Sequence, residues 1–275
     1  MTYPPSGWRL LLSPPADGAA NMAVDEAILL TLAAGKAPPT LRFFAWTPPC
    51  LSLGYAQPLA DVDVDRLKAR GWGLVRRPTG GRAILHADEL TYSVIVPLSE
   101  PRVQGGVIES YRQLSAGLLR GLELLGLCAR ADKKYDLPDR EAKGPVCFET
   151  PSSYEITADD KKLLGSAQTR KEGIVLQHGA LPLAGDIARI CDVLRFETDA
   201  ARQQARTRVL ERATTVARTS GQDVAWNQAA QALARGFAET LNLTLAEGAL
   251  TRPEEVLADK LRAEKYGTEA WNAKV

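Results

Sequence analysis

RRPTGGRAILH, residues 76–86 of this chain, decides how the first half of the sequence folds. Residues 72–77 are expected to form a strand, residues 78–81 a turn, and residues 83–86 an extended segment that leads to a second strand at 90–97. The stretch matches neither the phosphate-binding loop of nucleotide hydrolases nor the dinucleotide fingerprint. It therefore predicts a glycine turn between strands.

The turn combines two glycines with three arginines. Gly80 and Gly81 carry no side chain, so a ligand can approach their backbone closely. Arg76, Arg77 and Arg82 surround the turn with positive charge, which suits a substrate with a phosphate or a phosphopantetheine arm. A plain Gly-Gly hairpin with exposed arginines fits the same spacing, so the turn alone leaves both interpretations open.

KLLGSAQTR, residues 162–170, is expected to lie in the second strand of a hairpin. Residues 153–157 have strand character, residues 158–160 form a turn, and the chain is extended from Lys161 onward. Side-chain alternation places Lys161 and Lys162 on opposite faces of that strand. Only one of them can face a cleft, and the two leucines that follow do not decide which.

PVCFETPS, residues 145–152, places a cysteine in a loop. Glycine and proline on both sides of Cys147 interrupt regular structure and leave its side chain able to face a cleft. The thiolate is the nucleophilic form of cysteine, and a neighbouring cation such as a lysine favours it by lowering the pKa of the thiol. The apolar neighbours of Cys147 also fit a cysteine that is buried as a small hydrophobic residue.

The remaining segments alternate between short strands and helices. Asn21 is expected to cap a helix that ends near Gly35, and residues 41–46 and 51–55 are expected to pair around two prolines. Residues 108–125 repeat apolar side chains on one helical face, which is typical of a core helix packed on a sheet. Further helices are expected at 62–70, at 226–241 and from Pro253 to Gly267, with another strand at 173–183. The pattern predicts an α+β fold, with mixed or antiparallel β-sheets flanked by helices.

The C-terminal part has a different composition. Residues 197–218 are rich in arginine and poor in large apolar residues, which fits a solvated helix or a docking surface for an acidic partner. No linker marks a boundary, so residues 8–195 are expected to form the main body and residues 197–275 a helical extension of one domain, 1–275. The arginines in question are Arg202, Arg206, Arg208, Arg212 and Arg218.

Composition narrows the class of protein. The chain has 275 residues, of which 45% are hydrophobic, enough for a sizeable core. A net charge of +1 does not favour nucleic acid as a partner. No apolar run reaches the roughly 18 residues that a membrane span needs, and the N-terminus lacks the pattern of a secretory signal. A soluble, cytoplasmic protein is expected.

Neither the cysteines nor the histidines predict a metal site or a disulfide framework. The cysteines are widely spaced and include no CxxC pair, and a reducing compartment would keep a thiol usable. His86 and His178 are far apart in the sequence, and each fits either a residue that orients a substrate or a hydrogen-bonded structural histidine. No cofactor is expected. The four cysteines are Cys50, Cys128, Cys147 and Cys191.

As an ordered set, four stretches resemble the biotin and lipoate protein ligase superfamily, and within it the cysteine-dependent octanoyltransferases of the LipM type. The resemblance covers most of residues 8–195 and rests on NMAVDEAIL (21–29), RRPTGGRAILH with ELTYS following, PVCF, and KLLGSAQTR with LQHGALPL following. It implies that Cys147 holds an acyl thioester. It also implies that Lys162, separated from Gly-Ser-Ala by two residues, lowers the pKa of that thiol.

The resemblance further implies transfer of an octanoyl group from octanoyl-acyl carrier protein to a lysine of a lipoyl domain or of the glycine-cleavage H protein. Substrate-binding positions would be Arg76, Arg77, Gly80, Gly81, Arg82, His86, Gly165, Ser166, Ala167, Gln168, His178 and Gly179.

Two positions depart from the pattern of ATP-dependent lipoate ligases. Those enzymes usually carry a third glycine where this chain has Arg82, and an aspartate directly after the histidine, where Ala87 precedes Asp88 here. Both departures favour a transferase. The alternatives are an ATP-dependent ligase, an amidotransferase that moves octanoyl between lipoyl domains, and a non-catalytic protein that binds lipoyl domains and needs neither Cys147 nor Lys162.

Overall fold

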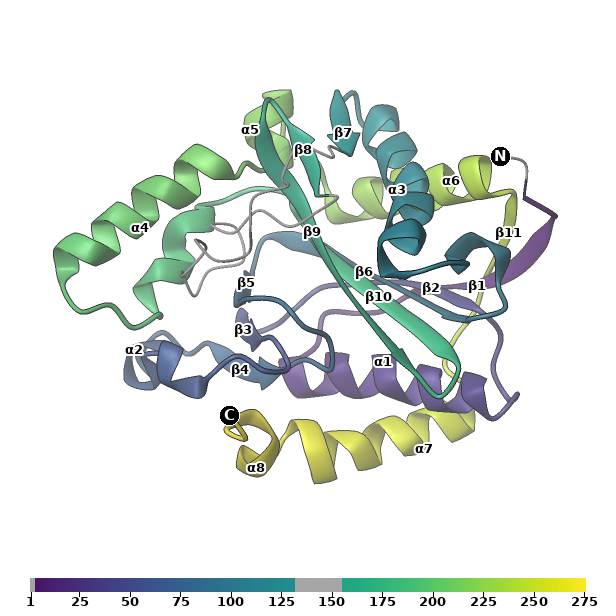
Figure 1. Ribbon diagram of the computed structural model, residues 1–275, viewed down its shortest axis with the longest axis horizontal. Coiled ribbons are helices and arrows are strands. Elements are labelled where there is room, and N and C mark those ends of the chain that lie inside the picture. The colour runs from purple at the N-terminus through teal and green to yellow at the C-terminus, as the bar shows by residue number, and fades with distance from the viewer. Residues whose placement is uncertain (1–2, 132–154) are drawn as a thin grey trace.

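The computed structural model describes residues 3–131 and 155–275, and a mixed eight-stranded sheet runs through the middle of the molecule (Figure 1). The strand order is β11-β1-β2-β6-β10-β9-β8-β7, with β1 parallel to both β11 and β2 and the other neighbours antiparallel. The bounds are β1 (Ser6–Leu12), β2 (Thr40–Phe44), β6 (Glu89–Pro97), β7 (Ala129–Ala131), β8 (Ile156–Ala158), β9 (Lys161–Lys171), β10 (Ile174–Pro182) and β11 (Leu243–Glu247).

A smaller sheet carries the glycine turn. It has the order β4-β3-β5, with β3 parallel to β4 and antiparallel to β5. Its strands are β3 (Cys50–Leu53), β4 (Gly73–Arg76) and β5 (Ile84–His86). The α+β class with mixed sheets is therefore confirmed.

Helices cover both faces of the large sheet (Figure 1). On one face α3 and α6 pack against each other and against the sheet, and on the other face α1 packs on the sheet and α7 packs on α1. The central strands β6 and β10 are buried almost throughout, which explains their nearly continuous apolar sequences. The helices are α1 (Gly18–Ala33), α2 (Val64–Ala69), α3 (Val107–Leu124), α4 (Asp199–Arg212), α5 (Val216–Ser220), α6 (Trp226–Leu241), α7 (Arg252–Leu261) and α8 (Glu269–Asn272).

Two expectations about the N-terminal third are wrong. The cap of α1 is Asp17, whose carboxylate accepts a hydrogen bond of 2.8 Å from the Ala20 amide, while Asn21 lies inside the helix and donates to the carbonyls of Ala16 and Ala45. The strands β2 and β3 do not pair, because the chain passes from the large sheet to the small one at Pro48. Proline offers no amide hydrogen to continue a ladder.

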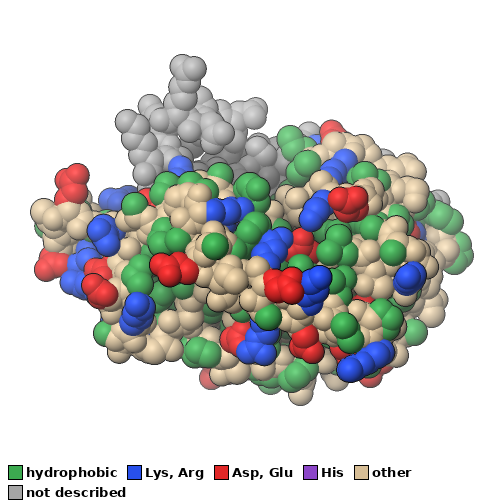
Figure 2. Space-filling view, turned by 90° about the horizontal axis from the view of Figure 1, so that it is seen from below, with side chains coloured by type: hydrophobic (Ala, Val, Ile, Leu, Met, Phe, Trp, Pro, Cys, Tyr) green, Lys and Arg blue, Asp and Glu red, His purple; other side chains and the backbone are tan. Residues whose placement is uncertain are grey.

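The C-terminal elements close the fold. The expected helix from Pro253 to Gly267 is present as α7 followed by a π-helical turn, Arg262–Tyr266, and α8 comes after it. On the face that carries α7, acidic and basic side chains are interspersed (Figure 2), and several pair with one another, as Arg262 does with Asp17 and Lys265 with Glu26. No helix in the described residues is long and apolar enough to cross a membrane.

The arginine-rich segment, residues 197–218, forms α4 and the first residues of α5 and not one continuous helix. Two of its arginines pair with acidic residues that lie outside or at the start of the helix: Arg206 contacts Asp186 and Asp192, and Arg202 contacts Asp199. This part of α4 is therefore attached to the body of the molecule and its charge is largely compensated.

Candidate active site

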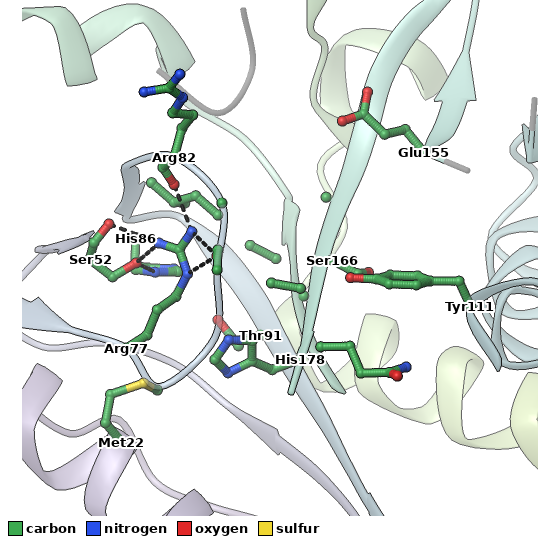
Figure 3. Close-up of a pocket in the computed structure, with 18 of the residues that line it drawn as sticks. Met22, Ser52, Arg77, Arg82, His86, Thr91, Tyr111, Glu155, Ser166 and His178 are labelled. Carbon is green, nitrogen blue, oxygen red and sulfur yellow. Dashed lines mark hydrogen bonds between the residues drawn. The ribbon is translucent and has the colours of Figure 1, made fainter. Parts of the chain in front are cut away.

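A cavity of about 380 Å³ lies between the glycine turn of the small sheet and the side of β9 that faces the first turns of α3 (Figure 3). The structure brings together around this cavity every predicted substrate-binding residue except Arg76. Its walls are mostly apolar, with a few polar groups, which is typical of a small-molecule site. The cavity is also lined by residues of α1, β3, β5, β6, β10 and α3 and by two residues outside these elements, Trp46 and Glu155: Met22, Trp46, Ser52, Ile84, Thr91, Val107, Ile108, Tyr111, Glu155 and Ala180.

Arg76 is fully buried and faces away from this cavity. Its guanidinium donates to the carbonyl oxygens of Gly54 (2.8 Å) and Gln57 (2.6 Å) and to that of Asn272 (2.8 Å), and its amide donates to the Asn272 side chain (2.7 Å). The expectation that Arg76 offers positive charge to a substrate at the turn is wrong, because its guanidinium is buried against these carbonyl oxygens. Arg76 instead joins strand β4 to the last turn of the chain.

Arg77 lines the cavity but is also held by the turn. Its guanidinium donates to the carbonyl oxygens of Gly80 (2.8 Å) and Arg82 (2.7 Å) and to Ser52. Gly81 has φ of +93°, and a Cβ there would lie 2.9 Å from Arg77 Nη2. Glycine is needed at this position because the turn wraps around an arginine, in addition to any approach of a ligand.

His86 belongs to a buried network on the floor of the cavity. Its ring stacks on Trp46 with centroids 4.0 Å apart, Nδ1 lies 2.8 Å from Glu89 Oε1, and Nε2 lies 2.7 Å from Ser52 Oγ. Arg77 can only donate to Ser52, so the Ser52 hydroxyl is free to donate its hydrogen to Nε2. In that arrangement Nδ1 donates to Glu89, so both ring nitrogens of His86 have a partner.

His178, on β10 of the large sheet, belongs to a similar network. Its Nε2 lies 2.6 Å from Thr79 Oγ1 in the glycine turn, and its Nδ1 lies 3.6 Å from Asp25 Oδ2 in α1. Burial lowers the pKa of His178 below its ordinary value, although Asp25 opposes this effect. The histidine is therefore neutral at pH 7 and attaches the turn to the large sheet.

Lys162 forms a buried ion pair at the edge of the cavity. The predicted hairpin is present in its described part: β8 and β9 are antiparallel, and the turn residues Asp159 and Asp160 both have positive φ. The two lysines lie on opposite faces, since Lys161 donates to the Leu210 carbonyl at 2.8 Å and Lys162 pairs with Glu155. Cys147 lies outside the described residues.

The charged group that lines the cavity at this edge is the carboxylate of Glu155 (Figure 3). The Lys162 side chain lies just behind the wall, where its Cε would be 3.0 Å from a Cβ at Gly165. Only glycine at position 165 leaves room for this lysine without displacement. Lys162 and Glu155 are both buried, at 5% and 6% side-chain exposure, so their charges compensate each other away from water.

Several lining residues were not predicted from the sequence. Ile108 and Tyr111 were expected to belong to the core, but Ile108 is 45% exposed and both side chains line the cavity. Both residues lie in the first turns of α3, before the well-buried Leu114. This position is the sequence feature that could have indicated that they line a cavity. Met22 reaches the cavity from α1 and Trp46 from the segment after β2, and nothing local in the sequence indicates this.

In residues 3–131 and 155–275, no three histidine, cysteine, aspartate or glutamate side chains gather as metal ligands would. The polar groups of the cavity are instead hydrogen-bonded to one another. Such a wall can orient an acyl carbonyl and bind its apolar chain.

Known proteins resemble this chain over nearly its full length. A model of the lipoyl protein ligase A/B catalytic domain matches residues 17–238. The octanoyltransferase LipM of Kyrpidia tusciae is 45% identical over 273 residues, covering 96% of this chain and 98% of the relative. The octanoyltransferase LipM of Symbiobacterium thermophilum is 43% identical over 271 residues, covering 97% and 98%. Among solved structures, a bi-partite lipoate protein ligase of Thermoplasma acidophilum has a TM-score of 0.82 at 29% identity, covering 98% and 96% of the two chains.

Proposed function

The chain belongs to the lipoyl protein ligase A/B catalytic-domain family and is an octanoyltransferase of lipoate biosynthesis, and we propose that it works through an acyl thioester on Cys147. The donor in this proposal is octanoyl-acyl carrier protein, and the acceptor is a lysine of a lipoyl domain or of the glycine-cleavage H protein. The reaction takes place in the reducing cytoplasm, where the thiol stays usable.

One observation carries the proposal: the GSA segment at Gly165–Ala167, the glycine turn and the Lys162–Glu155 pair meet at a single apolar cavity. A volume of about 380 Å³ falls in the range of small-molecule sites, roughly 300–1,000 Å³. Met22, Trp46 and Ile84 supply an apolar surface for the hydrocarbon chain.

In the first half-reaction, the thiolate of Cys147 attacks the carbonyl carbon of the donor thioester. A new C–S bond forms to the enzyme, the C–S bond to the carrier breaks, and the carrier thiolate leaves and takes up a proton. The positive charge of Lys162 favours the thiolate form of Cys147. Its ion pair with Glu155 keeps Lys162 protonated in a buried position, and the carboxylate offsets part of the effect of that charge on Cys147.

In the second half-reaction, the neutral amine of the acceptor lysine attacks the acyl-enzyme. A C–N bond forms, the C–S bond to Cys147 breaks, and the nitrogen loses one proton to solvent. The result is an octanoyl amide and a regenerated thiolate.

Intact-protein mass tests the proposal. The wild type, Cys147→Ala and Cys128→Ala are incubated with octanoyl-acyl carrier protein without ATP. Cys128 is the matched control because its side chain is exposed. An octanoyl adduct that hydroxylamine removes is expected on the wild type and on Cys128→Ala, but not on Cys147→Ala.

A second candidate is an ATP-dependent lipoate ligase, which the likeness to the Thermoplasma acidophilum ligase favours. For that activity the incubation without ATP would give no adduct on the wild type, and in a parallel incubation with ATP, octanoic acid and a lipoyl domain, transfer would survive in Cys147→Ala. An amidotransferase would form the adduct from an octanoylated lipoyl domain but not from the acyl carrier protein.

A further inference from the structure

A row of polar side chains crosses three strands beside the cavity. Tyr92 of β6 pairs with Gly179 of β10, and Gly179 pairs with Ser166 of β9. Because Gly179 has no side chain, the Tyr92 hydroxyl reaches across it to lie 2.7 Å from Ser166 Oγ. A Cβ at Gly179 would come within 2.6 Å of both Ser166 Oγ and Tyr92 Cε1, so the contact depends on this glycine.

The row continues toward the first turn of α3. Gln177 Nε2 donates to the Tyr92 hydroxyl at 2.8 Å, and Gln168 Nε2 donates to Gln177 Oε1 at 2.9 Å. Arg170 Nε donates to Gln168 Oε1 at 3.1 Å. The rest of the Arg170 guanidinium is held by the carbonyls of Gly105 and Gly106 and by Ser110.

Arg170 determines which group donates and which accepts in each hydrogen bond of this row. A guanidinium carries donors only, so Gln168 must turn its oxygen toward Arg170 and its NH₂ group toward Gln177. Gln177 must then accept with its oxygen and donate its own NH₂ group to Tyr92. The reversed arrangement would place the NH₂ group of Gln168 against the donor of Arg170.

The consequence reaches the cavity at Ser166. Tyr92 already accepts from Gln177, and within the described residues Ser166 is the acceptor available for its single hydrogen. Burial raises the pKa of Tyr92 to about 12, so this hydrogen is present throughout the neutral range. Ser166 therefore accepts from Tyr92, and no described side chain or carbonyl takes the hydrogen of Ser166 itself.

Ser166 lines the cavity on the side opposite Arg77 and His86 (Figure 3). We propose that Ser166 is a catalytic residue: its hydroxyl, oriented by the row that begins at Arg170, donates a hydrogen bond to the carbonyl oxygen of the acyl group and stabilises the negative charge that this oxygen acquires. This inference rests on the proposed function and adds a residue to its mechanism. Tyr92, Gln177, Gln168 and Arg170 are positioning residues.

The role of Ser166 is the same in both half-reactions. As the nucleophile bonds to the carbonyl carbon, the carbon–oxygen π electrons move to the oxygen, and the Ser166 O–H group donates to the resulting oxyanion. When the intermediate collapses, the electrons return, the C–S bond breaks and the thiolate leaves. Ser166 keeps its proton throughout, so it acts by electrostatic stabilisation and not as an acid or a base.

Single-turnover rates of the acyl-enzyme test this role. Loss of one preorganised oxyanion donor typically slows catalysis by roughly 100- to 1,000-fold. Ser166→Ala is expected to slow both formation of the octanoyl adduct and its transfer to a lipoyl domain by such a factor at saturating substrate. The matched control is Ser115→Ala in α3, whose hydroxyl donates to the Tyr111 carbonyl at 2.7 Å, and it should transfer at the wild-type rate.

A double-mutant cycle tests whether the row acts through Ser166. Tyr92→Phe removes the group that orients Ser166, and we expect a smaller loss of about tenfold, comparable with one ordinary hydrogen bond. In the Ser166→Ala background the same substitution should have almost no further effect on the rate, because its route to the substrate is already gone.

Three results would overturn the inference: wild-type rates in Ser166→Ala, a loss confined to apparent substrate affinity, or independent and multiplicative effects of the two substitutions. Failure of the proposed function is distinguishable from all of them, because the wild type itself would then form no adduct. Because Tyr92→Phe leaves Ser166 in place, its rate also reports on the inference if Ser166→Ala does not fold.

Discussion

Glu155 lines the cavity and also takes part in a buried ion pair that should stabilise the fold. It forms an ion pair with Lys162, and both side chains are almost fully buried. Breaking a buried ion pair by removing one partner leaves an uncompensated charge. Glu155→Ala should therefore lower the free energy of unfolding by about 3 kcal/mol, measured by urea denaturation at pH 7.

The matched control for Glu155 is Glu197→Ala, because Glu197 is exposed. This control should change the free energy of unfolding by no more than about 0.5 kcal/mol. Equal stability of the two variants would show that the Lys162–Glu155 pair contributes nothing to the fold.

Gly179 offers a second test at the scale of one residue. A methyl group there would meet Ser166 Oγ, Tyr92 Cε1 and the Gly165 carbonyl oxygen, all within 2.7 Å. Gly179→Ala is expected to cost about 2 kcal/mol of stability by overpacking and to slow acyl transfer, measured by thermal unfolding and by single-turnover rates. Gly7→Ala is the control, since Gly7 also lies in a strand but a Cβ there has no atom within 4 Å. A wild-type melting temperature in Gly179→Ala would contradict this account.

Individual residues were predictable from the sequence where a local rule governs them. Strand alternation placed Lys161 and Lys162 on opposite faces, and the structure confirms it. The burial of Arg76 was not predictable, because its partner Asn272 lies almost 200 positions away in the sequence. The cavity-lining position of Glu155 also depends on where the hairpin joins the large sheet, which alternation does not specify.

At the scale of elements, hydrogen bonds join α8 to the end of β4, next to the glycine turn. They lead to a prediction about stability. Trp271 Nε1 donates to the Arg76 carbonyl at 2.8 Å, and Asn272 accepts from Arg76 with both its side-chain and its backbone oxygen. These bonds hold the end of β4, directly before the turn. Asn272→Ala is expected to cost about 1–2 kcal/mol and to increase the rate of amide hydrogen exchange in residues 76–82.

Asn227→Ala serves as the control for Asn272→Ala, because Asn227 is exposed at the start of α6. Its exchange rates in residues 76–82 should match the wild type. Unchanged exchange in Asn272→Ala would mean that the last turn does not support the glycine turn.

Elements with a strong internal pattern were predicted well. The amphipathic helix expected at 108–125 is present as Val107–Leu124, and the turn expected at 158–160 and the strand expected from Lys161 are present within one residue. The prediction that residues 41–46 pair with residues 51–55 is wrong, because two strands that are neighbours in the sequence can belong to different sheets. In this chain β2 pairs with β1 and β6, and β3 pairs with β4 and β5.

At the scale of the whole molecule, buried ionisable groups predict how stability depends on pH. The pKa of His178 is lowered by burial, so the unfolded chain binds a proton near the ordinary value of 6.5 while the folded protein does not. Stability must fall as the pH drops below about 6.5, because the unfolded state then binds more protons.

Buried carboxylates extend this trend to lower pH. Burial alone would raise the pKa of Asp25 and Glu26, but Arg42 and Lys265 respectively hold both below their ordinary values. Their contribution is present above pH 4 to 5 and is lost as the pH falls further. We expect urea midpoints to fall from pH 7.5 to pH 6, and faster from pH 5 to pH 4.

Replacing His178 by Gln separates the two contributions. The urea midpoint of His178→Gln should no longer fall between pH 7 and pH 5, and it should still fall steeply below pH 5. A midpoint that rises on acidification in the wild type would show that other groups dominate the titration.

The closure of the fold by its last elements has a consequence for synthesis on the ribosome. Strand β1 pairs with β2 on one side and with β11 on the other, and α1 is covered by α7, so these early segments complete their contacts after residues beyond position 240 have been synthesised. At 5–20 residues per second, translation leaves them without these partners for roughly 10 to 50 s. A nascent chain with exposed apolar strands for that long is a natural client of ribosome-associated chaperones, and its yield should depend on them more than that of a protein whose neighbours in space are neighbours in sequence.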